Sequence, residues 1–251
     1  MKAFVTGASS GMGRDMARYL SSKGYDLILV GRNNQKLLEL KSELKTDSRI
    51  LNADLSKVEN VMELYKQIED EDIDIAINDA GFGVFGEFWE TDLEKELNLI
   101  GTNITALHIL TKLFLEKMRK KNAGYILNVS SMASFTPGPL MATYYASKAY
   151  VTYLSRAISK ELEKADSKIV VSTLCPGPVA TNFNNVAGVN FSMKPMTSEY
   201  VAKYAIDNLL KGKRTIIPGK KNKFLHFLSK LAPSNLAMNA VYKNQTKKIV
   251  K

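Results

Sequence analysis

The segment Thr6-Gly-Ala-Ser-Ser-Gly-Met-Gly13, TGASSGMG, joins an apolar run at Lys2–Thr6 to a helical pattern at Met12–Ser22. Its three glycines permit a tight turn, close approach of the backbone to a phosphate and close packing of the following helix, whose first N–H groups can bind an anion. A glycine cluster alone is often only a turn, but a strand before it and a helix after it are typical of a dinucleotide site. We therefore expect a cofactor to bind this loop through Gly7, Ser9, Ser10, Gly11, Met12 and Gly13.

On both sides of this loop, apolar runs alternate with helical patterns. The runs predicted as buried strands are Lys2–Thr6, Asp26–Val30, Ile50–Leu51, Ile73–Ile77, Tyr125–Val129 and Ile169–Leu174. The segments predicted as helices are Met12–Ser22, Asn34–Leu44, Val58–Glu69, Asn103–Lys120 and Tyr144–Lys164. Because parallel neighbours need crossover connections, this order predicts an α/β fold with a doubly wound parallel sheet and helices on both faces. Without a repeat or linker we expect one domain, with a core at 1–210 and a basic extension at 211–251 that completes it.

Composition limits the chemistry of this 251-residue chain, of which 45% is hydrophobic. The single cysteine, Cys175, excludes an internal disulfide and is expected to be a packed apolar residue. With His108 and His226 as the only histidines, we expect neither a zinc cluster nor a histidine-based triad, and no metal site. The chain contains no apolar run of 18 residues and starts directly with a strand pattern, so an intracellular, cytoplasmic protein is expected. Catalysis would then use hydroxyls, amines, amides or a cofactor.

The net charge of +10 is concentrated near the end of the chain. Residues 211–251 hold eleven Lys and Arg and no Asp or Glu, whereas residues 1–210 carry 24 basic and 25 acidic side chains. A nearly neutral body argues against nucleic-acid binding. Within the tail, Lys220–Leu231 has the pattern of a basic amphipathic helix, which would suit an anionic membrane, a cover over an apolar substrate or an oligomer contact. A helix docked on its own domain with its lysines in water is the plainer alternative.

The residue after the second predicted strand bears on which nicotinamide cofactor is used. NAD sites usually place a carboxylate there for the ribose hydroxyls, whereas a 2′-phosphate needs a cation. The sequence reads Val30-Gly-Arg-Asn33, so Arg32 is in position to bind that phosphate and no acid competes with it. A solvated arginine at the start of the next helix is the alternative. We predict NADP(H) rather than NAD(H).

A possible proton donor lies in Thr143–Tyr150, TYYASKAY. Tyrosine, with an ordinary pKa near ~10, needs a nearby cation to exchange its proton at neutral pH. Lys148 is that cation. On a helix, Tyr144 and Tyr145 lie four and three residues before it, and both spacings bring side chains onto one face. Spacing alone therefore leaves both tyrosines as candidates.

Together these motifs resemble the short-chain dehydrogenase/reductase family. The resemblance rests on Gly-x-x-x-Gly-x-Gly, on the serine pair Ser130-Ser131 after the fifth strand, and on Tyr-x-x-x-Lys about a dozen residues later. It implies a Rossmann-like fold with Tyr144 as acid/base and Ser131 positioning the substrate oxygen. Lys148 would lower the tyrosine pKa and hold the nicotinamide ribose. Asn103 would hold the water of a proton relay, although an Asn at a helix start is often only a cap.

The resemblance implies further cofactor contacts. Asp54 and Leu55 would lie against the adenine, and Asn78, Ala80 and Gly81 would form the wall near the adenosine ribose. Asp79 departs from the family's usual Asn-Asn-Ala-Gly, so the side-chain bonds of that position are open. Past the sixth strand, the segment expected to contact the nicotinamide carboxamide contributes Pro176, Gly177, Val179 and Thr181.

The implied activity is NADP-linked interconversion of a carbonyl and an alcohol on an apolar or amphipathic substrate, such as a steroid, a 3-oxoacyl chain or a small ketone. A catalytically silent NADP-binding regulator or scaffold with the same fold is the alternative. A homodimer or homotetramer is implied as well. We expect Asn182–Ser198 to form a mobile lid. The residues expected to line an apolar pocket are Phe82, Val84, Phe85, Phe135, Leu140 and Met141.

Overall fold

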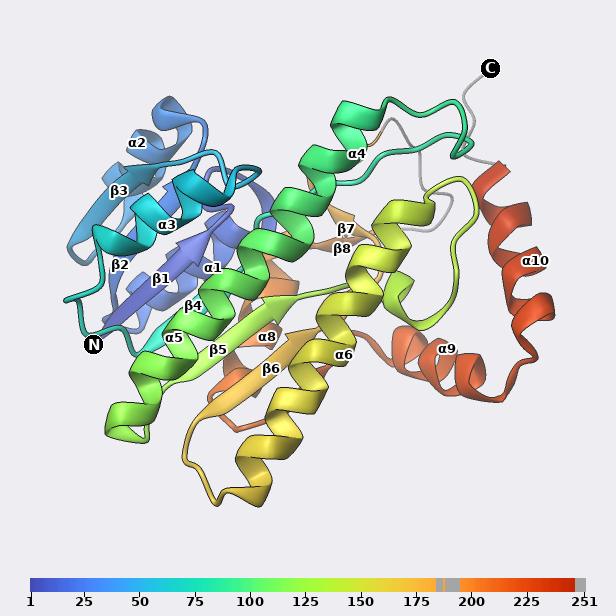
Figure 1. Ribbon diagram of the computed structural model, residues 1–251. Coiled ribbons are helices and arrows are strands. Elements are labelled where there is room, and N and C mark those ends of the chain that lie inside the picture. Colours follow the sequence, from blue (N-terminus) through green and yellow to red (C-terminus); the bar gives the residue numbers. More distant parts are fainter. Residues whose placement is uncertain (184–186, 188–194, 247–251) are drawn as a thin grey trace.

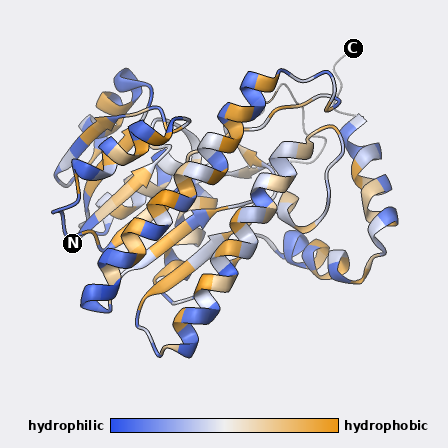
Figure 2. Cartoon of the chain, viewed as in Figure 1, coloured by the Kyte–Doolittle hydropathy of each residue, from blue (hydrophilic) through white to orange (hydrophobic). Residues whose placement is uncertain are grey.

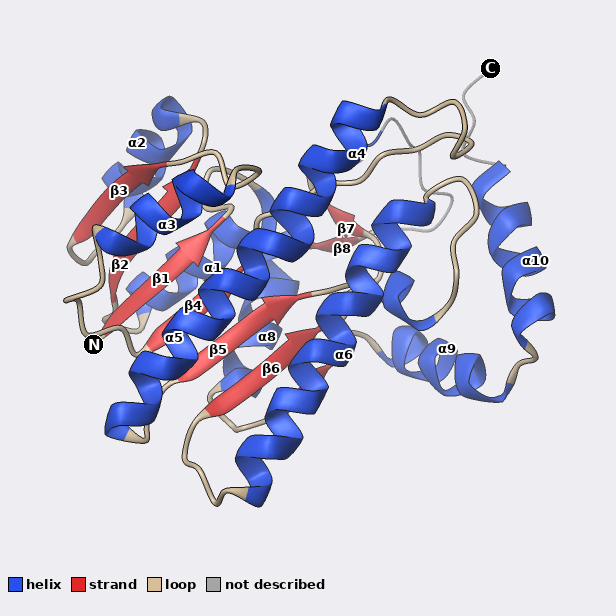
Figure 3. Cartoon of the chain, viewed as in Figure 1, coloured by secondary structure: helices blue, strands red, loops and turns tan. Residues whose placement is uncertain are grey.

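A seven-stranded parallel sheet forms the centre of the protein (Figures 1 and 3). The computed structural model describes residues 1–183, 187 and 195–246. In spatial order the strands are β3 (Ser48–Asn52), β2 (Asp26–Gly31), β1 (Lys2–Thr6), β4 (Ile75–Asn78), β5 (Tyr125–Val129), β6 (Val170–Leu174) and β9 (Thr215–Ile216). The chain runs outward from β1 toward β3 and then returns to β4 on the other side of β1. This reversal leaves a crevice beyond the carboxyl ends of β1 and β4, where open α/β sheets bind ligands.

Each face of the sheet is covered by its own layer of helices. Strand residues alternate, so Val5 and Ile77 pack on one face while Phe4 and Ala76 pack on the other. The first face carries α1 (Gly11–Ser22), α2 (Asn34–Glu43) and α8 (Ser198–Leu209). The second face carries α3 (Val58–Lys66), α5 (Leu107–Lys121) and α6 (Ala142–Lys164). Figure 2 shows the apolar strands between these layers. The predicted doubly wound α/β fold is confirmed.

The predicted helix start at Asn103 is wrong. The helix begins at α4 (Leu93–Ile100), where the Asp92 carboxylate accepts a hydrogen bond from the Lys95 N–H at 2.8 Å, and passes through a π-helical turn at Gly101–Ala106 into α5. Gly101 reads as a helix break in the sequence, but it has a packing role. A Cβ there would lie 2.3 Å from the Ser56 carbonyl oxygen, so only glycine allows this close approach.

The C-terminal part adds to the fold at one edge. Strand β9 pairs with β6, and β7 (Val179–Ala180) pairs with β8 (Met196–Thr197) in a separate two-stranded sheet. Helices α9 (Lys220–Leu231) and α10 (Ser234–Thr246) lie beside α6, far from β2 and β3 (Figure 1). Most of the predicted lid, Asn182–Ser198, lies outside the described residues. Within the part of the chain that the structure covers, no helix is both long and apolar enough to cross a bilayer.

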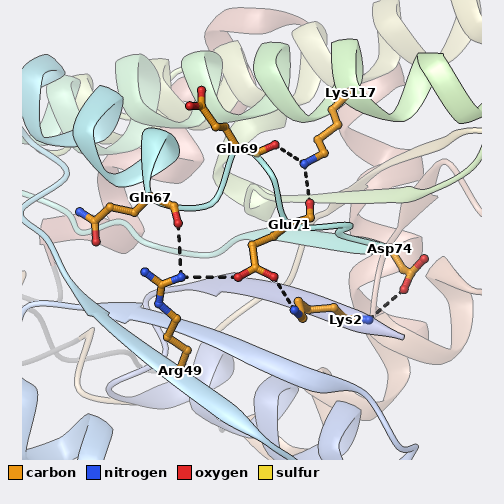
Figure 4. Close-up of polar contacts among 7 residues, drawn as sticks. All are labelled: Lys2, Arg49, Gln67, Glu69, Glu71, Asp74 and Lys117. Carbon is orange, nitrogen blue, oxygen red and sulfur yellow. Dashed lines mark hydrogen bonds and ion pairs between the residues drawn. The ribbon is translucent and has the colours of Figure 1, made fainter.

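A polar cluster connects several elements at the amino-terminal ends of the strands, the end of the sheet opposite the crevice (Figure 4). The Glu71 carboxylate forms ion pairs with Lys2 of β1 and Arg49 of β3. The Lys2 backbone N–H donates to Asp74 at 2.8 Å, and the Lys117 ammonium of α5 donates to the Glu71 carbonyl at 2.5 Å. Partly exposed pairs of this kind contribute little stability each. They fix the connection between α3 and β4 at the end of the molecule away from the crevice.

Candidate active site

A cavity of about 740 Å³ occupies the crevice at the carboxyl ends of the strands. Of the residues predicted for catalysis and cofactor binding, all line it except Gly13, Asn78 and Asn103. A volume of this size accommodates a ligand rather than one or two waters. The topology thus brings together segments that are far apart in the sequence.

The glycine-rich loop has the shape that an anion site needs. Gly7 and Gly11 adopt positive φ angles of 70° and 56°, and a Cβ on Gly13 would lie 2.6 Å from the Gly7 carbonyl oxygen. The Ser10 side chain makes no capping hydrogen bond to α1, whose first turn contains no acidic residue. The amino end of α1 therefore presents its positive dipole to the cavity, and the loop fits the pyrophosphate of a dinucleotide.

Asp79, the residue that departs from the family pattern, lies under this loop. One of its carboxyl oxygens would be 2.8 Å from a Cβ on Gly13, whose backbone N–H donates to it. The other oxygen is buried and has no hydrogen-bond partner among the described residues. Burial raises the pKa of this carboxyl to about 7, against the opposing attraction of Lys148. An asparagine there would carry no charge, so Asp79 adds an ionisable group that this position usually lacks.

Asn78 does not line the cavity, and its side chain is directed toward α5 and the neighbouring strand β5. Its amide nitrogen donates to Asn128 at 2.8 Å and to the Thr111 hydroxyl at 3.2 Å. Both partners are buried, so Asn78 ties β4 to β5 and α5. Ala80 and Gly81 follow it on the cavity wall.

Lys148 is a buried lysine held at the end of β5. Its ammonium donates to the Val129 carbonyl at 2.9 Å and lies 5.9 Å from the centre of the Tyr144 ring. Burial lowers the pKa of Lys148 to about 8, while the negative charge of Asp79 acts to raise it. This ammonium therefore exchanges protons closer to neutral pH than an ordinary lysine, which suits a role in proton transfer.

Tyr144 is the tyrosine that pairs with the predicted serine. Its phenol makes a hydrogen bond with the Ser131 side chain, and Ser131 is held at the start of a 3₁₀ turn where its hydroxyl accepts from the Ala133 N–H at 3.1 Å. The expectation that Lys148 lowers the pKa of Tyr144 stays a prediction. Burial raises the pKa of Tyr144, the Ser131 bond opposes that rise, and the lysine ammonium is directed to the Val129 carbonyl instead. Tyr144 is thus a neutral phenol at physiological pH, suited to donating a proton.

Tyr145 has a structural partner instead. Its hydroxyl accepts a hydrogen bond from the Gln245 amide of α10 at 3.0 Å, and its ring packs on Gly138, where a Cβ would lie 2.1 Å away. The contact with Gln245 spans 100 positions of sequence. Gln245 lines the cavity, is only 1% exposed, and its side-chain oxygen has no partner among the described residues. No local signal in the sequence points to this residue.

Asn103 is buried within the π-helical turn, close to Lys148. Its amide donates to the Phe82 carbonyl at 3.0 Å and to the Ser147 hydroxyl at 3.1 Å, and its oxygen accepts from the Phe82 N–H at 3.1 Å. A Cβ on Gly81 would be 2.9 Å from the Asn103 side-chain oxygen and 3.3 Å from the Lys148 nitrogen, so only glycine fits between them. The side chain fixes the turn after β4, and its part in a water relay stays a prediction. π-Helical turns are common at functional sites.

The far end of the cavity is formed by residues predicted to bind the adenosine. Arg32 is exposed, lines the cavity and forms no ion pair with any residue in the described ranges. The Ser9 hydroxyl lies beside Gly31, 3.2 Å from where a Cβ would be. Asp54 accepts from the Ser56 N–H at 3.0 Å, and Leu55 is buried beside it.

The segment after β6 closes the cavity from the other side. The Pro176 carbonyl accepts from the Met132 N–H at 2.9 Å, and the Thr181 methyl group would be 3.0 Å from a Cβ on Gly11. Gly177 packs on Asn222 of α9. Pro176, Gly177, Val179 and Thr181 all line the cavity, whereas Cys175 is fully buried beneath them, as expected of a packed residue.

Comparison with known proteins agrees with this geometry. The short chain dehydrogenase family model matches residues 1–189. An uncharacterized oxidoreductase of Staphylococcus epidermidis is 35% identical over 182 residues, which are 71% of this chain and 78% of the relative. A very-long-chain 3-oxoacyl-CoA reductase of Anas platyrhynchos is 29% identical over 96% of this chain and 78% of its own. A short-chain dehydrogenase from Sphingobium yanoikuyae in complex with NADPH superposes with a TM-score of 0.80 at 29% identity, covering 87% of this chain and 88% of that one.

The chain therefore belongs to the short-chain dehydrogenase family. It is an oxidoreductase of the type that acts on CH–OH groups with a nicotinamide cofactor. The predicted family is confirmed.

Proposed function

We propose that this protein is an NADP(H)-dependent reductase of an apolar or amphipathic ketone. The observation that carries the proposal is the neutral phenol of Tyr144, hydrogen-bonded to Ser131 and located above the buried ammonium of Lys148. Carbonyl reduction needs a proton donor that remains protonated at neutral pH and a second donor that polarises the carbonyl. The two hydroxyls supply both.

When bound, the nicotinamide supplies the hydride that adds to the carbonyl carbon. The Ser131 hydroxyl donates a hydrogen bond to the carbonyl oxygen and orients it toward the phenol. The Tyr144 O–H transfers its proton to that oxygen as the negative charge develops, which completes the alcohol. Lys148 would stabilise the resulting phenolate and hold the nicotinamide ribose. The glycine-rich loop would bind the pyrophosphate through the amino end of α1.

The cavity wall supports an apolar substrate. Its apolar lining includes Phe82, Phe135, Met141, Phe183, Leu225 and Val241, of which Phe183 packs on the Tyr144 ring. Three other side chains expected there, Val84, Phe85 and Leu140, do not line the cavity, and Phe85 packs behind the wall against the cluster that contains Met141. Such a wall excludes water and favours an acyl chain or a fused-ring skeleton over a charged substrate. The names of the related 3-oxoacyl-CoA reductases point to the same substrate class.

A substrate screen tests the activity. The purified protein is incubated with NADPH or NADH and a panel of 3-oxoacyl thioesters, ketosteroids and small ketones, and oxidation of the reduced cofactor is followed by its absorbance. We expect turnover with at least one hydrophobic ketone and NADPH. Saturable NADPH binding without turnover across the panel would instead support the catalytically silent regulator.

The choice of cofactor is tested at Arg32. Replacing Arg32 with Ala removes the cation expected at the 2′-phosphate, so the Kd for NADPH should rise by roughly 10- to 100-fold while the Kd for NADH changes little. Titration of the protein's fluorescence or isothermal calorimetry measures both constants. Lys36→Ala, at an exposed basic residue on α2 that does not line the cavity, is the matched control. Equal losses for both cofactors, or none, would refute the NADP(H) assignment.

A further inference from the structure

Helix α9 presents its apolar side to solvent. Phe224, Phe227, Leu228 and Leu231 recur at the spacing of one helical face, and their exposed fractions are 61%, 58%, 42% and 68%. On α10, Leu236 and Tyr242 are also exposed, at 65% and 46%. A helix whose function is only to complete the domain would bury such a face.

The opposite, polar side of α9 is the side that contacts the domain. The buried Asn222 amide donates to the Pro218 carbonyl at 2.8 Å, the His226 ring packs on Phe135 with centroids 4.0 Å apart, and Ser229 lines the cavity. An amphipathic helix ordinarily packs its apolar side on the domain, whereas α9 packs its polar side there. Its apolar face is left exposed in the part of the chain that the structure describes.

The charges around this face indicate the nature of a partner that would cover it. Exposed Lys220, Lys221, Lys223 and Lys230 lie along α9, and residues 211–246 contain no acidic side chain. A second copy placed face to face would bring the same lysines together, and like charges would oppose that pairing. An anionic bilayer surface complements both features, because lysines attract its headgroups while phenylalanine and leucine enter the interfacial region.

We propose that α9 is a docking helix that places the protein on an anionic membrane, with Phe224, Phe227, Leu228 and Leu231 inserted into the interface. The cavity supports this orientation, because Leu225 and Ser229 of α9 and Val241 of α10 form part of its wall. Docking through α9 would therefore bring this part of the cavity wall close to the membrane. The docking itself depends only on α9 and not on the proposed activity.

Vesicle binding tests this proposal with the full-length chain. We expect the protein to sediment with phosphatidylcholine vesicles containing about 30% phosphatidylserine at least roughly tenfold more tightly than with phosphatidylcholine alone, and less tightly as salt rises. The double variant Phe224→Ser/Phe227→Ser should lose at least about tenfold in vesicle affinity. Neither residue lines the cavity, so cofactor binding in solution should be unchanged and reports correct folding.

The matched control is Leu93→Ser/Leu97→Ser, which removes two apolar side chains of α4 that are 72% and 57% exposed. Its vesicle affinity should equal that of the unmodified protein. The proposal is overturned if anionic vesicles do not bind the protein, or if the α9 and control variants bind them equally. It is also overturned if the α9 substitutions convert a dimer to a monomer in gel filtration, which would identify the partner as a second copy.

Discussion

Replacing Tyr144 with Phe is expected to lower kcat/KM for ketone reduction by roughly 10²- to 10⁴-fold, the usual contribution of a general acid. The substitution removes one hydroxyl, the one bonded to Ser131, and keeps the ring in place against Phe183 at a centroid distance of 5.2 Å. Affinity for the cofactor should therefore change little. Steady-state kinetics with the best substrate of the screen, together with a cofactor titration, separate the two effects.

Tyr145→Phe is the matched control, one position along the same helix. It removes the hydroxyl that accepts from Gln245, so we expect a looser α10 and a rise of a few-fold in KM, with kcat nearly unchanged. If Tyr145→Phe abolished turnover and Tyr144→Phe did not, the assignment of the proton donor would be reversed.

The sequence alone does not show which of these two tyrosine hydroxyls faces the serine. Spacing from Lys148 places both on one side of a helix, and only the Tyr-x-x-x-Lys pattern favours Tyr144. In the structure the two hydroxyls differ in what they face: one meets Ser131 at the end of β5 and the other meets Gln245 of α10. That second contact depends on how the C-terminal helices fold back. A local pattern carries no information on such a contact.

The fold itself was accessible from the sequence because its signals are local. Buried parallel strands read as continuous apolar runs, and the glycines of the first turn stand between a strand and a helix. The errors came where tertiary contact decided the structure. Gly101 lies inside a continuous helical segment, where the close approach of the Ser56 carbonyl leaves no room for a Cβ. Asn78 is directed away from the cavity and donates to Asn128 in the next strand. The burial that raises the pKa of Tyr144 is likewise a property of the assembled cavity, which a local pattern does not show.

Lys148→Met should lower kcat/KM by at least about a hundredfold, because it removes the cation that stabilises the phenolate of Tyr144. Methionine has a similar length and carries no charge to desolvate, so the chain should still fold. The Val129 carbonyl loses its donor, which costs about 1–3 kcal/mol of unfolding free energy, measurable by thermal denaturation. Lys160→Met, at an exposed lysine on the same helix, should change neither rate nor stability appreciably.

The pH dependence of this effect distinguishes a lysine that takes part in proton transfer from one that only fills space. Activity that needs the Lys148 ammonium falls as pH rises through its pKa of about 8, so kcat/KM should decline on that side of the profile. Asp79→Asn removes the negative charge that raises this pKa, so the decline should move to lower pH while the rate at pH 6 stays near that of the unmodified protein. In Lys148→Met the decline should be absent. A profile that Asp79→Asn leaves in place would show that the carboxyl under the glycine loop does not act on Lys148, and a decline that survives Lys148→Met would assign it to another group.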